Sequence, residues 1–352
     1  MHAFCFRRGR GVSGGRCDPT LQATEGEAAE GSDRFGGRYR PNGIDDPRKK
    51  TGMPAPLLRV LKTSLLLLVA GVLAAGCGFG GGGKLTLGYL GWDENVANSN
   101  LTKVLLEDDL GYESVELKLA DDVGPVYDDL IEGNTDAFLD AWMPNHRQFV
   151  DRGGGKLEVS KEPWYVGQTR YGIAAPKYMQ GVRSISDLDS SGTDMLTGIE
   201  PGAVLMKRIE TDVVPEYHLH VSLVEASTPA MLAELEQAYS MKEPFVFLAW
   251  SPHWMNQEYE FRYLSDPKNA MGTVDDPQRL HSVARKGLAE DEPAAYALIN
   301  AMRLDEDEVG SLEIAINKAD DPGTGVRRWL EEKENRELVR PWIEAARDAQ
   351  EG

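Results

Sequence analysis

The sequence predicts an α/β protein built on parallel or mixed sheets that helices cover on both faces. From residue 84 onward, short apolar runs typical of strands alternate with amphipathic segments of helical period, a pattern that belongs to this fold class. About 270 residues follow residue 83, which is enough for two lobes of ordinary size. From about residue 275 to the end the pattern is mostly helical.

The first series of elements extends to residue 142. We expect strands at 84–90, 115–119 and 136–142, a helix at 98–111 that ends at Gly111, and a second helix at 125–133. The apolar segment 170–179 contains a strand that Pro176 stops, and its composition suits a crossing between lobes.

A second series of the same kind follows. We expect strands at 196–202, 220–226 and 244–250, a helix from about 203, and another at 228–242. The helical C-terminal part includes 293–304, 320–333 and a final helix that contains Trp342.

The beginning of the chain predicts export. Residues 57–75 hold Arg59 and Lys62, then an uncharged apolar run of roughly a dozen residues, and small residues lead to Cys77. This order is typical of a secretory signal, and the run is shorter than the ~20 residues of a membrane span. The cysteine after small residues resembles a bacterial lipobox, although Leu73 lies one position further from it than usual. We expect 53–76 to be a lipoprotein signal peptide and Cys77 to be the lipidated first residue of the mature protein.

Residues 1–52 differ in composition, being rich in Arg, Gly and polar residues without apolar periodicity. We expect a mis-assigned start, with Met53 as the true one; a disordered basic extension is the alternative. The glycine-rich stretch at 77–83 reads as a flexible tether. No cysteine follows Cys77, so the exported part has neither disulfides nor thiolate chemistry.

The charge balance is acidic. The chain has 38 Lys and Arg against 57 Asp and Glu, a formal net charge of −19. Such a surface repels nucleic acid and anionic lipid and favours cationic partners only weakly at physiological salt. We therefore expect no nucleic-acid partner.

Three tryptophans lie where predicted strands run out into loops. Trp92, Trp142 and Trp250 lie in YLGWDENVA, LDAWMPNH and FLAWSPHW, where open α/β folds place their ligands. A trimethylated nitrogen has no N–H to donate, so only shape and the negative face of aromatic rings can hold it. The pattern indicates a binding protein for betaine-type solutes. The alternative is that these tryptophans simply fill the core.

An enzyme is the competing class. The chain has no G-x-S-x-G elbow, H-E-x-x-H pair or Walker A loop. The best catalytic group that can be assembled is His146 and His253 with Asp93 or Asp140, as a metal or hydrolase site. Acids are so abundant here that one near a histidine is expected by chance, so we expect neither catalysis, a metal nor a cofactor.

A set of motifs makes the interpretation specific: YLGWDENVA, DAWMPNH, GIEPGAVLM, MLAELEQAY, AWSPHW, YLSDP and HSVARKGL. They cover nearly all of 84–305 and resemble the substrate-binding proteins of ABC importers for glycine betaine and proline betaine. The resemblance implies a type II periplasmic-binding fold, with two α/β lobes and a hinge between them. Lobe 1 would comprise 84–172 and 262–352, and lobe 2 would comprise 173–261.

The resemblance also implies a site. In the family a prism of three tryptophans holds the ammonium group, and these match Trp92, Trp142 and Trp250. Backbone N–H groups after an I-D-P-G-type turn hold the carboxylate, which here is IEPGAVLM and maps the donors to Val204 and Leu205. Helix starts present such unpaired N–H groups. His146 matches a further carboxylate contact, with an exposed loop histidine as the alternative, whereas His253 and His281 read as structural.

The implied partners are a small betaine ligand, an ABC permease and ATPase complex, and the membrane through a lipid anchor. Glycine betaine, proline betaine, carnitine, choline and sulfonium analogues all remain open as ligands. The carboxylate-binding turn argues against choline, because its hydroxyl would use those N–H groups poorly. A module that senses a solute for a signalling receptor is the alternative role.

Overall fold

The computed structural model describes residues 83–272 and 278–352, which belong to one compact unit that begins at Ala74. The expected signal peptide, Cys77 and the glycines at 78–82 lie outside the described residues. Within the described ranges, no helix combines the length and the apolar character needed to cross a membrane.

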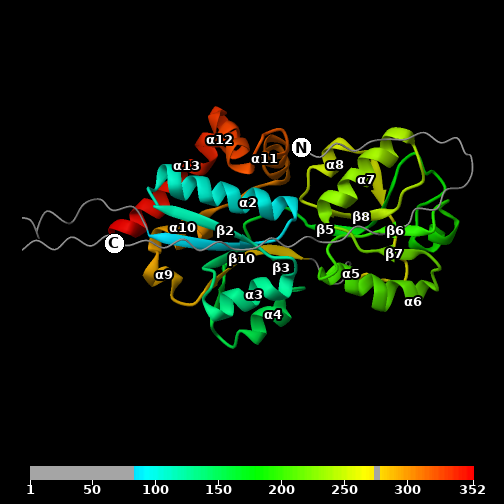
Figure 1. Ribbon diagram of the computed structural model, residues 1–352, viewed down its shortest axis with the longest axis horizontal. Coiled ribbons are helices and arrows are strands. Elements are labelled where there is room, and N and C mark those ends of the chain that lie inside the picture. Colours follow the sequence, from blue (N-terminus) through cyan, green and yellow to red (C-terminus); the bar gives the residue numbers. More distant parts are fainter. Residues whose placement is uncertain (1–82, 273–277) are drawn as a thin grey trace, which may run out of the picture. The chain divides into compact units, whose positions relative to one another are not determined.

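Two five-stranded sheets form the framework (Figure 1). The first has the order β2-β1-β3-β10-β4, with β1 Lys84–Tyr89, β2 Ser114–Leu119, β3 Ala137–Met143, β4 Leu157–Val159 and β10 Arg279–Arg285. Strand β1 is parallel to β2 and β3, whereas β10 is antiparallel to β3 and β4. The first sheet is therefore mixed, as the alternating pattern predicts.

The second sheet has the order β7-β6-β8-β5-β9, with β5 Arg170–Pro176, β6 Met195–Thr197, β7 Ser222–Val224, β8 Phe247–Ser251 and β9 Phe261–Tyr263. Strands β6, β7 and β8 run parallel, and β5 is antiparallel to β8 and β9. Both sheets thus have parallel strands at one edge and an antiparallel strand inserted beside them.

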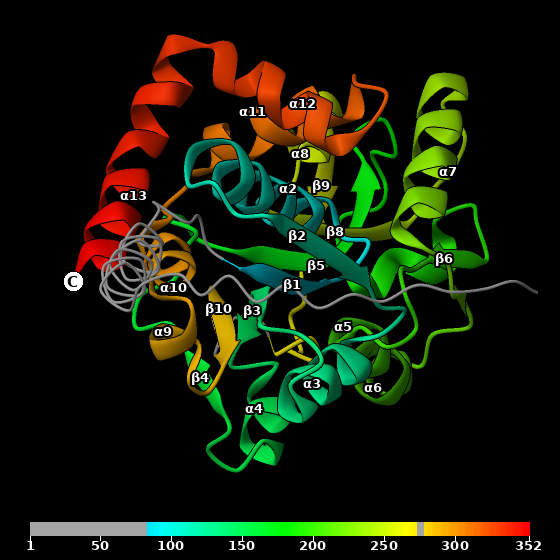
Figure 2. The ribbon, with the colours of Figure 1, turned by 60° about the vertical axis from the view of Figure 1, so that its left-hand side comes forward.

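Helices cover both faces of the first sheet. Figures 1 and 2 show α2 (Asp93–Val104), α11 (Glu306–Asn317) and α12 (Pro322–Glu331) on one side, and α3 (Val123–Glu132) and α4 (Arg147–Arg152) on the other. Helix α2 continues as a π-helical turn, Leu105–Asp109. Helix α10 (Pro293–Ala301) follows the short α9 (Leu288–Asp291) and packs on the C-terminal α13 (Lys333–Glu351).

The second sheet is covered in the same way. Helices α7 (Thr228–Met241) and α8 (Met255–Glu258) lie on one side, and α5 (Val204–Arg208) and α6 (Val214–Tyr217) lie on the other (Figure 1). A π-helical turn, Ile209–Val213, joins α5 to α6, and a 3₁₀ turn spans Ile185–Ser190.

Local signals explain where two of the helices near the site begin. Ser227 accepts a hydrogen bond from Ala230 N at the start of α7. Asp305 and Glu308 form a capping box at the start of α11, in which each side chain accepts from the other residue's backbone N–H. Such caps satisfy N–H groups that have no partner inside the helix.

Helix α2 begins five residues earlier than the sequence suggested, at Asp93 rather than near residue 98. Its buried face carries the polar side chains of Asn95, Asn98 and Ser99, which interrupt the apolar stripe that marks a helix. Asp93 and Glu94 occupy the first turn, where negative charge favours the helix start. As a result Trp92 lies directly before a helix, and no loop separates them.

Strand β10 was missed, because the part of the chain after about residue 275 was expected to be mostly helical. Leu280, Val283 and Ala284 are buried, but the pairing with β3 shifts register between His281 and Val283. An irregularity of this kind breaks the period of two by which a strand is recognised. The strand returns the chain to the first sheet, between β3 and β4.

Two-lobed folds of this type have one sheet at the core of each lobe, and the first sheet here takes residues from both ends of the described chain. We propose 84–172 with 262–352 as lobe 1 and 173–261 as lobe 2. Strands β5 (Arg170–Pro176) and β9 (Phe261–Tyr263) run through the two boundaries. The chain therefore passes from one lobe to the other in two strands that pair with each other.

Candidate functional site

A pocket lies where the ends of strands from both sheets meet. It contains about 430 Å³ of free space, including its open mouth. We call it the central pocket, and it is lined by Trp92, Glu94, Trp142, Asn145, His146, Tyr171, Ile199, Ala203, Val204, Leu205 and Trp250. All six residues singled out for ligand binding in the sequence are in this lining.

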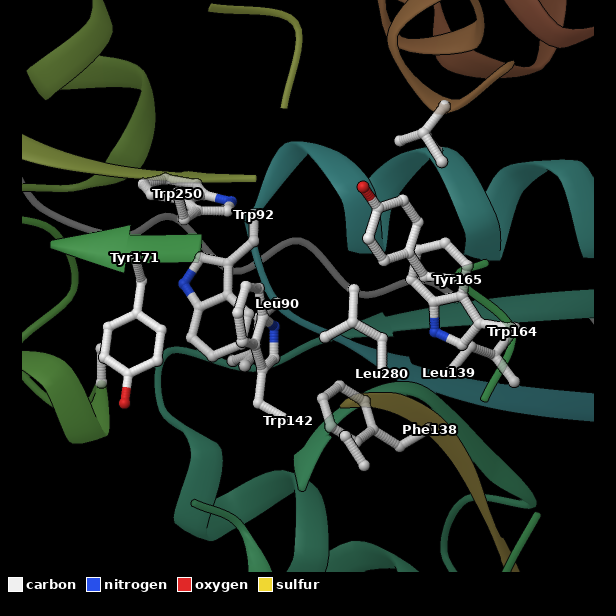
Figure 3. Packing of buried hydrophobic residues seen from close by; sticks show 14 of the residues in the cluster. Leu90, Trp92, Phe138, Leu139, Trp142, Trp164, Tyr165, Tyr171, Trp250 and Leu280 are labelled. Atoms are coloured by element: carbon white, nitrogen blue, oxygen red, sulfur yellow. The ribbon is translucent and has the colours of Figure 1, made fainter. Parts of the chain in front are cut away.

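The aromatic side chains come from strand ends of both sheets. Figure 3 shows the rings of Trp92, Trp142, Trp250 and Tyr171 gathered together. Trp142 lies near the end of β3, and Trp92 follows β1, the neighbouring parallel strand. Tyr171 of β5 is directly opposite Trp250 of β8 in the antiparallel pair, and directly paired residues project from the same face of a sheet. Sheet pairing thus positions both residues of the second sheet.

Each of these indoles donates its N–H to an acidic side chain. Trp92 Nε1 donates to Glu200 Oε2 at 3.1 Å, and Trp250 Nε1 donates to Glu94 Oε2 at 2.9 Å. Both bonds join a residue of the first sheet's body to one of the second. Trp142 Nε1 donates to Asp140 Oδ2 at 3.3 Å within β3. The indole edges are therefore fixed, while the faces remain available to the pocket.

His146 is buried rather than exposed, with 2% of its surface accessible, so the alternative of an exposed loop histidine is wrong. Its Nδ1 lies 3.3 Å from Tyr127 Oη, and its ring contacts those of Phe138 and Phe149. Burial lowers the pKa of His146 to about 3, so the imidazole is neutral at physiological pH. If Tyr127 donates to Nδ1, the Nε2–H remains free to donate.

Val204 and Leu205 form the first turn of α5. The preceding residue, Ala203, has no side chain that could cap the helix. The first N–H groups of a helix have no partner within it, and the helix start carries partial positive charge. This turn supplies backbone donors to the central pocket without supplying a charged side chain.

The described pocket lining contains an acidic side chain, Glu94, and its one basic side chain, His146, is neutral. Among the described residues that line it, none is Lys or Arg. Burial raises the pKa of Glu94 well above its usual range, and Asp140 and Glu313 add to the effect. Burial also raises the pKa of Asp140 to about 8, although the hydrogen bond from Trp142 acts in the opposite direction. A buried carboxyl pair with no cation beside it favours the protonated form.

Sequence reasoning missed several lining residues: Glu94, Asn145, Tyr171, Ile199 and Ala203. It also missed Glu200, which accepts hydrogen bonds from Trp92 Nε1, Thr228 N and Thr228 Oγ1. Glu94 and Glu200 lie within the motifs GWDE and IEPG, so their places beside predicted site residues could have indicated both. Tyr171 had none, because its place depends on the pairing of β5 with β8.

The two histidines expected to be structural, His253 and His281, have backbone partners. His253 Nδ1 accepts from Met255 N at 3.1 Å, and its Nε2 lies 3.2 Å from Asp93 Oδ2. His281 Nδ1 lies 2.9 Å from Ser160 O. Neither lines the central pocket. Among the residues that the structure describes, no three His, Cys, Asp or Glu side chains are grouped so that they could hold a metal ion.

Two α/β lobes with an aromatic pocket at their strand ends define a solute-binding protein of the periplasmic type. The chain belongs to the family of substrate-binding domains of ABC-type glycine betaine transport systems, whose family model matches residues 83–332. This membership confirms the resemblance drawn from the motifs.

Two curated relatives agree. The chain is 31% identical over 161 residues to the glycine betaine/carnitine transport binding protein GbuC of Listeria monocytogenes, a match that covers 45% of this chain and 52% of the relative. It is 23% identical over 211 residues to a glycine betaine/proline betaine-binding periplasmic protein of Escherichia coli, covering 51% and 64%. The matches therefore span less than two thirds of either relative.

Solved structures confirm the two-lobed fold. Lactococcal OpuAC, closed on glycine betaine, is 28% identical with a TM-score of 0.65, and the match covers 74% of this chain and 99% of that one. An ABC-transporter choline-binding protein in complex with choline is 25% identical with a TM-score of 0.65, covering 76% and 94%.

The raised pKa of Asp140 has a consequence for stability. The folded protein holds a proton that the unfolded chain releases above about pH 4, so this group makes the free energy of unfolding fall as the pH rises from about 4 to about 8. Asn has no such proton, and its side-chain oxygen can still accept from Trp142. We expect Asp140→Asn to show a smaller fall in Tm between about pH 5 and pH 8 than the unaltered protein, measured by circular dichroism.

The matched control is Asp151→Asn, which removes an exposed acid in α4. It should leave the pH dependence of Tm unchanged. An Asp140→Asn protein whose Tm follows pH as the unaltered protein does would contradict a raised pKa at this position.

Proposed function

We propose that this protein captures glycine betaine or a related quaternary ammonium osmoprotectant and delivers it to an ABC permease and ATPase complex. One observation carries the proposal: the central pocket is walled by three indoles and a phenol ring, and no Lys or Arg is among the described residues that line it. The positive charge in the pocket is then supplied by the ligand.

The aromatic walls suit a methylated cation. Trimethylammonium spreads its charge over a bulky apolar surface and donates no strong hydrogen bond, so aromatic faces bind it by cation–π attraction. Trp92, Trp142 and Trp250 form this cage. Each has less than a tenth of its surface accessible, and cation–π contacts are stronger when desolvated.

The opposite end of the pocket suits a carboxylate. The N–H groups of Val204 and Leu205 hold it at the start of α5, and His146 donates from its neutral ring. The ligand therefore lies with its cation between the indole faces and its carboxylate toward the first turn of α5.

Two further ligands have specific support. The Listeria relative is named for glycine betaine and carnitine, and one similar structure holds choline. Carnitine carries both groups that the pocket accommodates, whereas choline lacks the carboxylate. A role as a solute sensor for a signalling receptor would use the same pocket and would differ only in the partner.

We also propose that the protein is held at the outer face of a membrane by a lipid on Cys77. A charged start, a short apolar run and small residues precede this cysteine. Stable anchoring needs more than one acyl chain, and the diacylglycerol of bacterial lipoproteins supplies two.

Changing Trp92, Trp142 or Trp250 to Leu tests the cage. A desolvated cation–π contact is worth about 2 kcal/mol or more, so each change should lower affinity for glycine betaine by roughly tenfold or more. Replacement by Phe should cost less, because Phe keeps an aromatic face. Titration calorimetry measures both effects, and Trp254→Phe, outside the pocket lining, is the matched control.

A ligand control separates charge from shape. In the uncharged isostere of glycine betaine, a tert-butyl group replaces trimethylammonium. If this isostere binds as tightly as glycine betaine, or if the Leu variants keep full affinity, the tryptophans are ordinary core residues and the proposal is wrong.

The carboxylate end predicts a preference between ligands. Hydrogen bonds to a charged group contribute roughly 1.5–3 kcal/mol each, so glycine betaine should bind far better than choline. His146→Ala should weaken glycine betaine binding and leave choline nearly unchanged in the same protein preparation. Equal affinities of the unaltered protein for the two ligands would rule out the assignment of Val204, Leu205 and His146.

Cys77→Ala tests the anchor. The variant should be released from membranes or remain unprocessed, as shown by fractionation and mass spectrometry of the full chain. The same change at Cys17 should have no effect. A Cys77→Ala protein that stays with membranes at the processed mass would show that the anchor lies elsewhere.

A further inference from the structure

The three pocket tryptophans share an unusual kind of acceptor. The N–H groups of Trp92, Trp250 and Trp142 donate to the carboxyl groups of Glu200, Glu94 and Asp140. Two tryptophans elsewhere in the described chain differ: Trp329 Nε1 donates to the neutral hydroxyl of Ser311 at 2.9 Å, and Trp164 Nε1 has no partner within the described part. Trp254, which lies outside the pocket lining, also donates to a carboxyl group, that of Asp93 next to Glu94.

Burying these carboxyl groups lowers the stability of the fold. Glu94 and Asp140 have 1% and 0% of their surfaces accessible, and no described Lys or Arg forms an ion pair with either. A buried acid without a cation beside it destabilises a fold. A neutral amide or hydroxyl would satisfy the same indole N–H at lower cost, so packing alone does not explain the carboxyl groups.

A bound cation changes this balance. A carboxylate at the indole edge pushes electron density toward the ring and adds its own negative charge behind it. Cation–π attraction grows with the negative potential of the ring face, and the low effective dielectric of a buried site strengthens the attraction between the ligand and the acid. The hydrogen bond also fixes the plane of the ring, and charge-assisted bonds do this most strongly.

We propose that Glu94, Asp140 and Glu200 are positioning residues of the aromatic cage, each fixing one indole through its N–H and supplying negative charge behind the face that a methylated cation meets. The inference rests on the proposed function, because it requires a cationic ligand in the central pocket. It assigns to the three acids a role in discriminating a cation from an uncharged molecule of the same shape.

The two buried acids and Glu200 act differently. Glu94 and Asp140 are both buried, and their burial and the repulsion of Glu94 by Asp140 favour retention of a proton in the empty site. Glu200 is half-buried and accepts three hydrogen bonds. A cation in the cage lowers the pKa of the Glu94–Asp140 pair, so binding expels part of a proton and affinity rises with pH up to about 8.

Other titratable groups surround this pair and influence how its affinity for a cation depends on pH. Glu313 of α11 acts on both members of the pair, and Tyr127 of α3 lies near Asp140. Asp93 and Glu306 lie near Glu313. His253 Nε2 is 3.2 Å from Asp93 Oδ2, and His146 Nδ1 is 3.3 Å from Tyr127 Oη. Burial raises the pKa of Glu313 and lowers that of His146 to about 3. Because His146 stays neutral near pH 7, it takes up little proton there when a carboxylate binds.

Titration calorimetry of the full chain with glycine betaine, at about pH 7.5 in two buffers of different ionisation enthalpy, measures the protons released per ligand bound. We expect the unaltered protein to release a measurable fraction of a proton. Asp140→Asn and Glu94→Gln should bind roughly tenfold more weakly and release less. Glu200→Gln should bind more weakly with proton release unchanged, and Asp151→Asn should match the unaltered protein in both respects.

The tert-butyl isostere identifies the cause of any loss. If charge behind the rings matters, the acid variants should lose far more affinity for glycine betaine than for the isostere. Equal losses for both ligands would mean that the acids only hold the pocket in shape, and would overturn the inference. The inference would also be overturned if all three variants bound glycine betaine with full affinity and no proton was released on binding.

If Glu94→Gln or Asp140→Asn does not fold, as judged by circular dichroism, the half-buried Glu200→Gln still tests the dependence on charge through its betaine-to-isostere ratio. If the unaltered protein binds none of the quaternary ammonium ligands, the proposed function itself is wrong, and that result is distinct from betaine binding without proton release.

Discussion

The central pocket depends on hydrogen bonds between indoles and carboxyl groups that cross from one sheet to the other. Trp250 of β8 donates to Glu94 at the start of α2, and Trp92 before α2 donates to Glu200 beside α5. Each bond fixes an aromatic wall of the pocket and joins the two lobes by the same contact. The lobes must therefore be in this relative position before the walls are complete, which couples the shape of the pocket to closure.

The same region concentrates acids that have little to neutralise them. Asp93, Glu94, Glu306 and Glu313 meet the segment that runs from Trp250 to Trp254, and they accept hydrogen bonds from Trp250, Ser251 and Trp254. Hydrogen bonds from neutral donors offset only part of the cost of burying carboxyl groups. A ligand with a positive charge offsets the remaining desolvation cost of these buried carboxyl groups. If it has no hydrogen-bond donor, it does not compete with the indoles for the same oxygens.

Backbone N–H groups supply the partial positive charge that the acidic side chains lack. Helix α5 starts without a side-chain cap at Ala203 and continues through a π-helical turn, so its first N–H groups point out of the helix with partial positive charge. Gly202, just before this turn, is so close to Asp122 of the first sheet's body that an added Cβ would lie 1.9 Å from its Oδ1. A side chain at this position would therefore require the Asp122 carboxylate to move away from the donors of α5.

The sequence by itself determined the fold class, the family, and the residues whose place depends on local order. The motifs GWDE, AWMP and IEPGAV predict the places of Trp92, Trp142 and Val204, because the neighbouring strand or helix fixes the position of each residue. Tertiary structure alone decided what depends on pairing and burial: Tyr171 joins the pocket only because β5 pairs with β8, and β10 is hidden by its irregular register. Whether an abundant acid lies on the surface or behind an indole is likewise invisible in sequence, since burial and hydrogen-bond partners are set by residues far apart in the chain. The separation of 108 residues between Trp92 and Glu200 is one example.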